Sequence, residues 1–202
     1  MSDDTNFDES ALQAENLWLT QYDGKVERTL PASGLTIKDT IKQLVAAKPH
    51  QAHIIYHDQV LTYRESNGLA CKLANALLGL GCGKGDRISI ILPNIPETII
   101  SFMACYKTGM IAVGYNPRST EAEIRSNVNN HRAGTIIVDQ ENADKIIKLM
   151  HQKETSIKKI VVLGYSEDSN EDQVYDFYRL INNEEDIEPD ITVLPEDFAL
   201  LL

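Results

Sequence analysis

Two hydrophobic patterns alternate along the chain. In one, apolar residues recur every three or four positions, which is typical of helices with one buried face; the other is a short, almost unbroken apolar run, typical of strands buried on both faces. The expected helices cover residues 36–48, 62–79, 96–107, 120–131 and 141–152, and the expected strands cover residues 52–56, 60–62, 87–92, 110–114, 135–138 and 159–163. This alternation predicts βαβ units, and therefore an α/β fold with a mainly parallel sheet flanked by helices.

Three of the expected helices begin with the same local signal. Thr36, Thr62 and Thr120 are each followed three residues later by Asp or Glu, the pattern of a capping box, in which threonine and acid bond each other's backbone amides. Pro96 suits the first turn of its helix, where its missing N–H costs nothing. The helix starts are therefore expected to be well defined.

The C-terminal stretch differs from the rest of the chain in charge. The 202 residues carry a formal net charge of −11, yet residues 164–197 hold 12 acidic residues against Arg179 alone, and the remainder holds 18 of each sign. We expect one short helix at 174–181 between runs too charged to pack. A new apolar run opens after Pro195, and the chain ends inside it, so the sequence is interpreted as interrupted.

We expect the chain to have two parts: an arm over residues 1–34, which carries Trp18 and Tyr22, and an ordered unit over residues 35–202.

The even charge balance outside 164–197 argues against nucleic acid as a partner, since phosphate contacts need clustered Lys and Arg. The sequence has neither a signal-like start nor an apolar run of about 18 residues that would span a bilayer. The cytoplasm is the expected compartment, with peripheral membrane contact as an alternative.

A glycine-rich turn and a group of histidines suggest a phosphate-binding loop and a metal site, but the position of neither motif in the chain favours that function. The glycines between Gly81 and Gly85 follow a helix and precede a strand, the reverse of a phosphate loop, so Gly81 and Gly83 are interpreted as positive-φ residues of a helix end. His50, His53 and His57 do not share one face of a strand and have no acidic or cysteine partner, so no metal site is predicted.

The three cysteines show no paired spacing, which favours a reducing compartment over a disulfide scaffold. Cys71 and Cys105 lie among apolar residues of helices and are expected to be buried and unreactive. Cys82, in the glycine turn, is expected to be the more exposed thiol. The chain has no nucleophile elbow and no Ser–His–Asp order.

The loops that follow the strands are where a parallel sheet binds ligands. They hold Pro93–Pro96, Tyr115–Thr120 and Asp139–Gln140. Asn94, Asn116 and Arg118 are the candidates for lining a substrate-side surface, against the favoured interpretation that they shape turns and caps. No acid–base pair is present, so no catalytic residue is predicted, and from the residues alone the function stays open.

At these loops the chain resembles the adenylate-forming (AMP-binding) superfamily, and in particular the N-terminal portion of acyl-CoA synthetases. Four segments carry the resemblance, in the family's order and spacing: LTYRE at 61–65, GLGCGKGDRISIILPN at 79–94, YKTGMIAVGYNP at 106–117 and the run 120–139. Gly114 stands where the family usually has proline. The pattern around 18–22, 108–111 and 116–117 leans towards the fatty-acid branch.

The resemblance implies a ligase that uses ATP and Mg²⁺ to convert a carboxylate, expected to be a fatty acid, into an acyl-adenylate and pyrophosphate. The acyl group then passes to the thiol of coenzyme A. In the family, the phosphate-binding loop, the nucleotide contacts and the C-terminal lysine follow segments like these. The chain alone is therefore expected to be inactive and to bind none of these cofactors strongly. The resemblance to the fatty-acid branch also implies a possible homodimer, and no other feature of the sequence points to one.

Two other interpretations stay open at this point. The chain could be a catalytically dead remnant that acts as an interaction module, through its acidic stretch or by pairing with an intact synthetase. It could also be an unrelated nucleotide-binding α/β domain.

Overall fold

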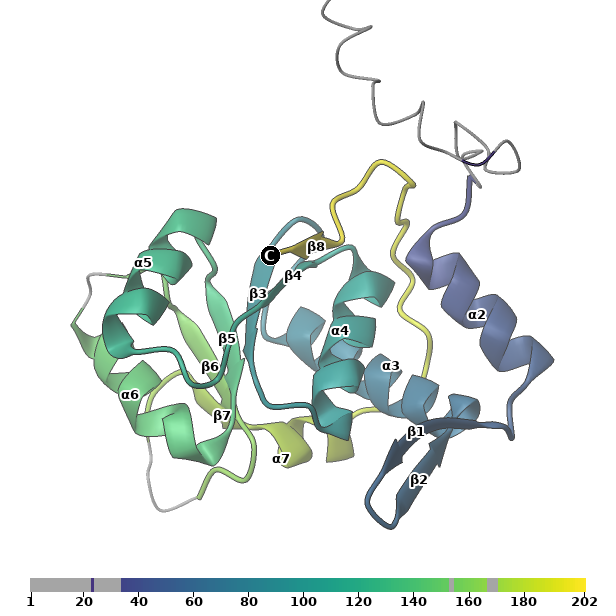
Figure 1. The fold of residues 1–202 in the computed structure, drawn as a ribbon, viewed down its shortest axis with the longest axis horizontal. Coiled ribbons are helices and arrows are strands. Elements are labelled where there is room, and N and C mark those ends of the chain that lie inside the picture. Colours follow the sequence, from purple (N-terminus) through teal and green to yellow (C-terminus); the bar gives the residue numbers. More distant parts are fainter. Residues whose placement is uncertain (1–22, 24–33, 153–154, 167–170) are drawn as a thin grey trace, which may run out of the picture. The chain divides into compact units, whose positions relative to one another are not determined.

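Figure 1 shows a parallel sheet with helices on both of its faces, formed by residues Leu35–Leu202. This computed structural model describes residue 23 and residues 34–152, 155–166 and 171–202. The chain divides into two compact units, Met1–Gly34 and Leu35–Leu202, and the fold described here is that of the second. The aromatic residues Trp18 and Tyr22 of the expected arm lie outside the described residues.

Helices and strands alternate as the hydrophobic pattern predicts. The helices are α2 (Ile37–Ala47), α3 (Tyr63–Gly79), α4 (Pro96–Thr108), α5 (Glu121–His131), α6 (Gln140–His151) and α7 (Phe177–Asn182). The strands are β1 (Ala52–Tyr56), β2 (Gln59–Thr62), β3 (Arg87–Ile91), β4 (Ile111–Gly114), β5 (Thr135–Val138), β6 (Lys159–Val162), β7 (Val174–Asp176) and β8 (Leu200–Leu201).

The main sheet has the strand order β7-β6-β5-β3-β4-β8, and every neighbouring pair is parallel. A separate antiparallel hairpin joins β1 to β2, with Ile55 opposite Val60. The expected α/β fold with a mainly parallel sheet is thus confirmed.

Side-chain alternation along the strands divides the core into two layers. Ile88 and Ile90 of β3 lie in the cluster that α3, α4 and α7 cover, whereas Ile91 lies in the cluster that α5 and α6 cover on the opposite face. Each strand needs apolar residues at consecutive positions because both faces are buried, which explains the unbroken apolar runs in the sequence.

The three threonine caps form as predicted. The hydroxyl oxygens of Thr36, Thr62 and Thr120 each accept a hydrogen bond from the backbone N–H three residues later, and the acid at that position accepts from the threonine N–H in return. These bonds hold the pKa of Glu65 and that of Glu123 below the ordinary range. Each cap satisfies two amides that the first helical turn leaves without a partner.

The glycine turn after α3 ends the helix and forms no phosphate loop. Gly81 has φ of 81°, its N–H donates to the Leu78 carbonyl and the Cys82 N–H donates to the Leu77 carbonyl. This pair of bonds is a Schellman motif, which requires a residue in the left-handed region. The second positive φ, 86°, lies at Gly85 and not at the expected Gly83, whose N–H instead donates to Asp86 Oδ2.

Two expectations about the acidic stretch were wrong. Val174–Asp176 is strand β7 and α7 begins only at Phe177, because the first three residues pair in parallel with β6. The segment 183–199 also packs: in Figure 1 it runs along α3 and α4 on the side of α2. Lysine and asparagine side chains donate to its backbone carbonyls, namely Lys38 to Pro189 and Ile191, Asn75 to Ile187, and Lys84 to Thr192.

The cysteines are all free thiols, and all are buried. Burial is confirmed for Cys71 and Cys105, which are 0% exposed, and Cys82 is the more exposed thiol as expected, but at 6% it is buried as well, with its Sγ 3.3 Å from Thr135 Oγ1. The turn folds back onto the start of β5, which covers the thiol.

Of the helices that the structure describes, none has the length and apolar character needed to cross a membrane.

Candidate functional site

The carboxyl ends of β3, β4 and β5 bring three loops to one edge of the sheet. From β3 the chain enters α4 on one face, whereas from its neighbours β4 and β5 it enters α5 and α6 on the opposite face. Helices that leave adjacent strands in opposite directions open a crevice between their loops, which is where open parallel sheets bind ligands. The candidate site is therefore this edge around β3.

The loop after β3 carries Asn94, which is exposed. Its neighbours set the turn: the Ile95 N–H and the Thr98 hydroxyl both donate to the Pro93 carbonyl, at 2.9 Å and 2.5 Å. Pro96 then begins α4 and is buried. The turn is thus fixed by its backbone and by Thr98, which leaves the Asn94 side chain at the surface.

The loop after β4 carries Asn116 and Arg118, both exposed. Asn116 Oδ1 accepts a bond of 2.9 Å from the Arg118 N–H, and the Asn116 carbonyl accepts one of 3.0 Å from the Ser119 N–H. Asn116 therefore shapes its own turn, in line with the favoured interpretation of this residue. The guanidinium of Arg118 remains as a cation that could meet a carboxylate or phosphate.

A polar network joins the β4 loop to the β5 loop. Asp139 Oδ1 caps α6 by accepting from the backbone N–H and the side-chain amide of Asn142, at 3.0 Å and 2.9 Å. Lys145 Nζ donates to Asn142 Oδ1 at 2.8 Å and to the Ser119 carbonyl at 3.2 Å. The lysine thus ties the two loops together across the edge.

An aromatic pair supports the same loop from behind. The Tyr115 hydroxyl lies 2.8 Å from His131 Nδ1, and the two rings stack at 5.8 Å. Burial raises the pKa of the Tyr115 hydroxyl, so it stays protonated at neutral pH. The pair links the end of β4 to the last turn of α5.

These groups form a rigid support and not a reaction centre. Asp139 is engaged as a cap, and Lys145 is engaged by two oxygens. In the described part of the chain no three His, Cys, Asp or Glu side chains gather in a way that could hold a metal ion. The edge leaves Asn94 and Arg118 exposed to a ligand, but the described residues by themselves do not fit a nucleoside triphosphate.

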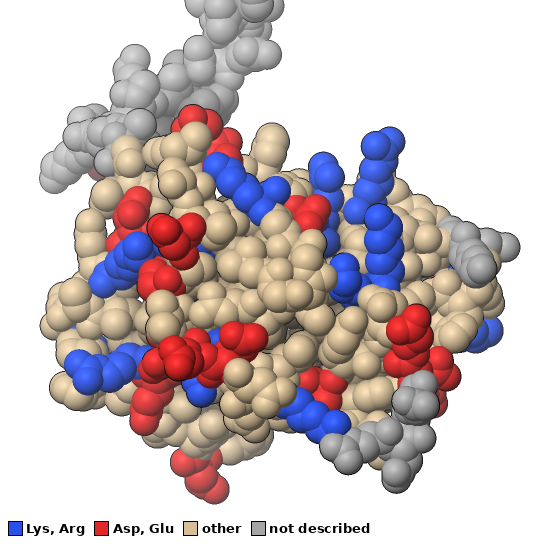
Figure 2. Space-filling view, turned by 180° about the vertical axis from the view of Figure 1, so that it is seen from behind, with Lys and Arg blue, Asp and Glu red and all other residues tan. Residues whose placement is uncertain are grey.

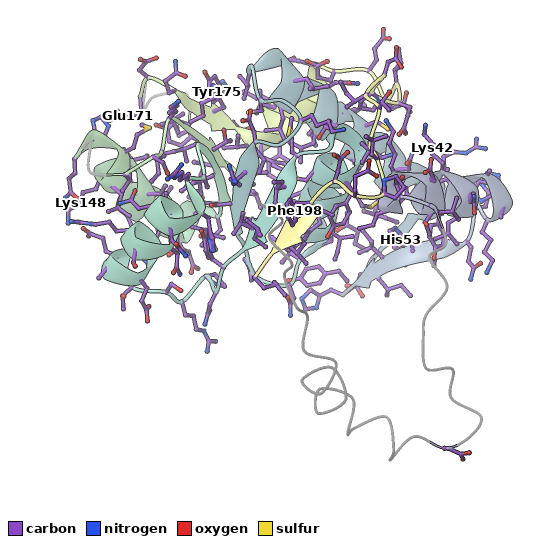
Figure 3. The ribbon with its side chains drawn as sticks, turned by 90° about the horizontal axis from the view of Figure 1, so that it is seen from above. Lys42, His53, Lys148, Glu171, Tyr175 and Phe198 are labelled. Carbon is purple, nitrogen blue, oxygen red and sulfur yellow. The ribbon has the colours of Figure 1, made fainter. Side chains whose placement is uncertain are left out.

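The three histidines considered earlier fall on the β1–β2 side. His50 and His57 are exposed, while His53 Nδ1 lies 2.7 Å from the buried Ser66 Oγ and its ring stacks on Tyr63 at 4.4 Å. Figure 3 shows His53, which belongs to the hairpin strand β1, on the same side of the molecule as Lys42. His53 therefore joins the hairpin to α3.

Sequence reasoning missed a buried ion pair. Lys107 is fully buried, and its Nζ lies 2.6 Å from Glu188 Oε2. The same carboxylate oxygen accepts a weak bond of 3.4 Å from Cys71 Sγ, and burial raises the pKa of that thiol to about 11. A lysine inside the otherwise apolar run of α4 was the signal that could have revealed it, since buried lysines are almost always paired.

Comparison with known proteins identifies the fold and its relatives. A family model described as AMP-binding enzyme matches residues 41–202. The chain belongs to the AMP-binding enzyme family. This chain is 30% identical over 138 residues to a long-chain-fatty-acid–CoA ligase of Bacillus subtilis, and 32% identical over 117 residues to an acetyl-coenzyme A synthetase of Nostoc linckia.

Each alignment covers a larger share of this chain than of the relative. The alignment with the B. subtilis ligase covers 68% of this chain and 25% of the ligase, and that with the Nostoc synthetase covers 52% and 34%. A long-chain-fatty-acid-CoA ligase of Archaeoglobus fulgidus superposes with a TM-score of 0.74 at 18% identity, covering 85% of this chain and 35% of the ligase. The chain spans about a quarter to a third of the relatives it matches.

Proposed function

We propose that this chain forms the N-terminal portion of an AMP-forming acyl-CoA ligase that acts on a fatty acid. The observation that carries the proposal is the family match over residues 41–202, because a match over this many residues supports a reaction class better than any single loop does. The 30% identity to a long-chain-fatty-acid–CoA ligase supports the substrate class. The candidate residues Asn94, Asn116 and Arg118 remain a proposal for lining the substrate side.

The proposed reaction has two steps. The carboxylate attacks the α-phosphorus of ATP, displaces pyrophosphate and gives an acyl-adenylate; the thiol of coenzyme A then attacks the acyl carbon and releases AMP. Mg²⁺ would neutralise the phosphate charge in the first step. AMP leaves far more readily than oxide or hydroxide would, which is why the carboxylate is activated first.

The 202 residues alone are proposed to be inactive. The edge loops use Asp139 and Lys145 for capping and loop-to-loop contacts, so a nucleotide would have to compete with these bonds. We propose the cytoplasm as the compartment, in line with three free and buried thiols. A homodimer is proposed from the family resemblance, and the exposed cross-strand pair Ile55 and Val60, 72% and 53% exposed, offers an apolar contact surface.

An exchange experiment tests the proposal. Residues 41–202 replace the matching segment of the B. subtilis ligase, and carboxylate-dependent exchange of pyrophosphate into ATP is measured with acetate, octanoate and hexadecanoate. We expect exchange with the longer acids for the fusion and none for the 202-residue chain. Two controls are the unaltered ligase and the ligase without the segment.

Three outcomes would contradict parts of the proposal. Exchange by the 202-residue chain alone would overturn its inactivity. A fusion with the circular dichroism and melting behaviour of the ligase, but no exchange with any acid, would overturn the assigned role. Preference for acetate would replace the fatty-acid assignment with a short-chain one. Light scattering of the purified chain tests the homodimer, which a monomer mass would exclude.

A further inference from the structure

A hollow of about 390 Å³ lies at the edge of the sheet opposite to the candidate site. It is formed where β3, β5 and β6 begin, between the turn that follows α3 and the segments that follow α5 and α6. Its volume falls within the range of about 300–1,000 Å³ that small-molecule sites occupy. The family match and the candidate site assign nothing to this hollow.

Four cations line the hollow. They are Arg87 at the start of β3, Arg132 at the end of α5, and Lys158 and Lys159 at the start of β6. The hollow also has one acidic residue, Asp86, whose Oδ2 already accepts a bond of 2.8 Å from the Gly83 N–H. The local charge is therefore strongly positive in a chain whose net charge is −11.

The four cations lack acidic partners among the residues that the structure describes. The described ion pairs involve other lysines and arginines, among them Lys84, Lys107 and Lys148. The chain has 30 acidic residues against 19 basic ones, so acidic partners are abundant elsewhere. Like charges around one hollow repel each other within a screening length of about 8 Å at physiological salt, and this repulsion would be relieved by a bound anion.

Backbone conformation holds the hollow open. Arg132 adopts the left-handed conformation, with φ of 54°, as the cap that ends α5. Ser156 Oγ lies 2.8 Å from the Ala133 carbonyl oxygen and 3.1 Å from that of Val128, and the Lys158 N–H donates to the Gly134 carbonyl at 2.8 Å. These bonds fix the chain on either side of the hollow without using the charged ends of the cationic side chains.

Figure 2 shows the back of the molecule, where Lys and Arg side chains gather in the upper right of the view with few acidic side chains among them. We propose that the hollow lined by Arg87, Arg132, Lys158 and Lys159 binds a phosphorylated anion. Guanidinium and ammonium groups that line one hollow suit phosphate oxygens, through charge-assisted hydrogen bonds. The phosphate can belong to a soluble polyphosphate compound or to an anionic lipid headgroup.

Calorimetric titration of the 202-residue chain tests the site. One arm titrates inorganic tripolyphosphate; the other titrates vesicles of phosphatidylcholine with about one-third phosphatidylglycerol, whose anionic headgroups attract basic surfaces. The site variant carries Arg87→Gln and Lys158→Gln, and the matched control carries Arg64→Gln and Lys48→Gln, which removes the same two charges from exposed positions on the α2 and α3 side.

We expect the site variant to bind the anion at least about tenfold more weakly than the wild type. Each charge-assisted hydrogen bond contributes roughly a factor of ten or more to the affinity. The control should retain wild-type affinity. Binding of tripolyphosphate assigns a soluble ligand, and binding of vesicles without tripolyphosphate assigns a lipid headgroup. Absence of both in the wild type, or equal losses in both variants, would overturn the proposal.

A second variant separates loss of the site from loss of the fold. Arg132→Asn removes one cation while asparagine tolerates the left-handed conformation at this position. Its melting temperature should match that of the wild type while its affinity falls. Unchanged affinity in this folded variant, together with unchanged affinity in the double variant, would also refute the site.

Discussion

Removal of the Glu188 carboxylate should destabilise the fold more than removal of its partner Lys107. Glu188→Ala leaves the Lys107 ammonium, which is fully buried, without the oxygen that now lies 2.6 Å away. Breaking a buried pair in this way costs about 3–5 kcal/mol. Because the Glu188 side chain is 28% exposed, water can reach the gap, and we expect a value near the lower limit, about 3 kcal/mol.

The reverse substitution removes the buried charge itself. Lys107→Met keeps an unbranched side chain of similar length in the helix, and Glu188 keeps Lys38 and Lys42 at 4.0 Å. We expect a cost of about 1 kcal/mol, and a similar cost for the double variant. The two changes should therefore couple by about 2–3 kcal/mol, a large share of a typical stability of about 5–15 kcal/mol.

Urea unfolding followed by far-ultraviolet circular dichroism measures these differences. The matched control is Lys42→Met, which removes a lysine that is 49% exposed from the same carboxylate and should cost within about 0.5 kcal/mol. The reasoning would be refuted if Glu188→Ala cost no more than the control did, or if Lys107→Met cost as much as Glu188→Ala.

Three further predictions concern local features. Thr120→Ala should lower the free energy of unfolding by about 1 kcal/mol through loss of its cap, which urea unfolding will measure; no change would argue against the capping box. Gly109→Ala should cost more than about 1 kcal/mol, since φ is 68° and a Cβ would lie 2.9 Å from the Lys84 side chain, whereas Gly79→Ala, with open space around it, should be neutral or stabilising. The Cys71 thiol, whose pKa is raised to about 11, should resist alkylation at pH 9, where about one per cent would be ionised; because its folded pKa is raised, stability should fall as pH rises from about 9 towards 11. Rapid labelling of the folded chain at pH 9 would contradict that burial.

Local sequence signals predicted most of the fold because they act over a few residues. The boxes at Thr36, Thr62 and Thr120 and the Schellman turn at Gly81 depend on neighbours within six positions, and all of them formed. Strand β7 was taken for part of a helix because its three residues become a strand only through pairing with β6. That pairing is a tertiary effect, which no local pattern contains.

The site was harder to predict than the fold. The carboxyl-end loops could be located from the strand order that βαβ units impose, but Asn116 was found to bond its own turn, and nothing in the spacing distinguished this from a ligand contact. The Lys107–Glu188 pair joins residues 81 positions apart. The cationic hollow draws its four charges from three separate elements, so it exists only once the sheet has formed.

The way in which segment 183–199 is held bears on how the molecule opens. Its carbonyls are bonded by side chains of Lys38, Asn75 and Lys84, whereas the central strands are bonded by backbone ladders on both sides. Strand β8 at its end pairs with β4 through two residues only, and Phe198 beside it is 73% exposed (Figure 3). Amide hydrogens of this segment should therefore exchange with solvent through local openings, well before those of β3 and β5, which exchange only when the whole sheet comes apart.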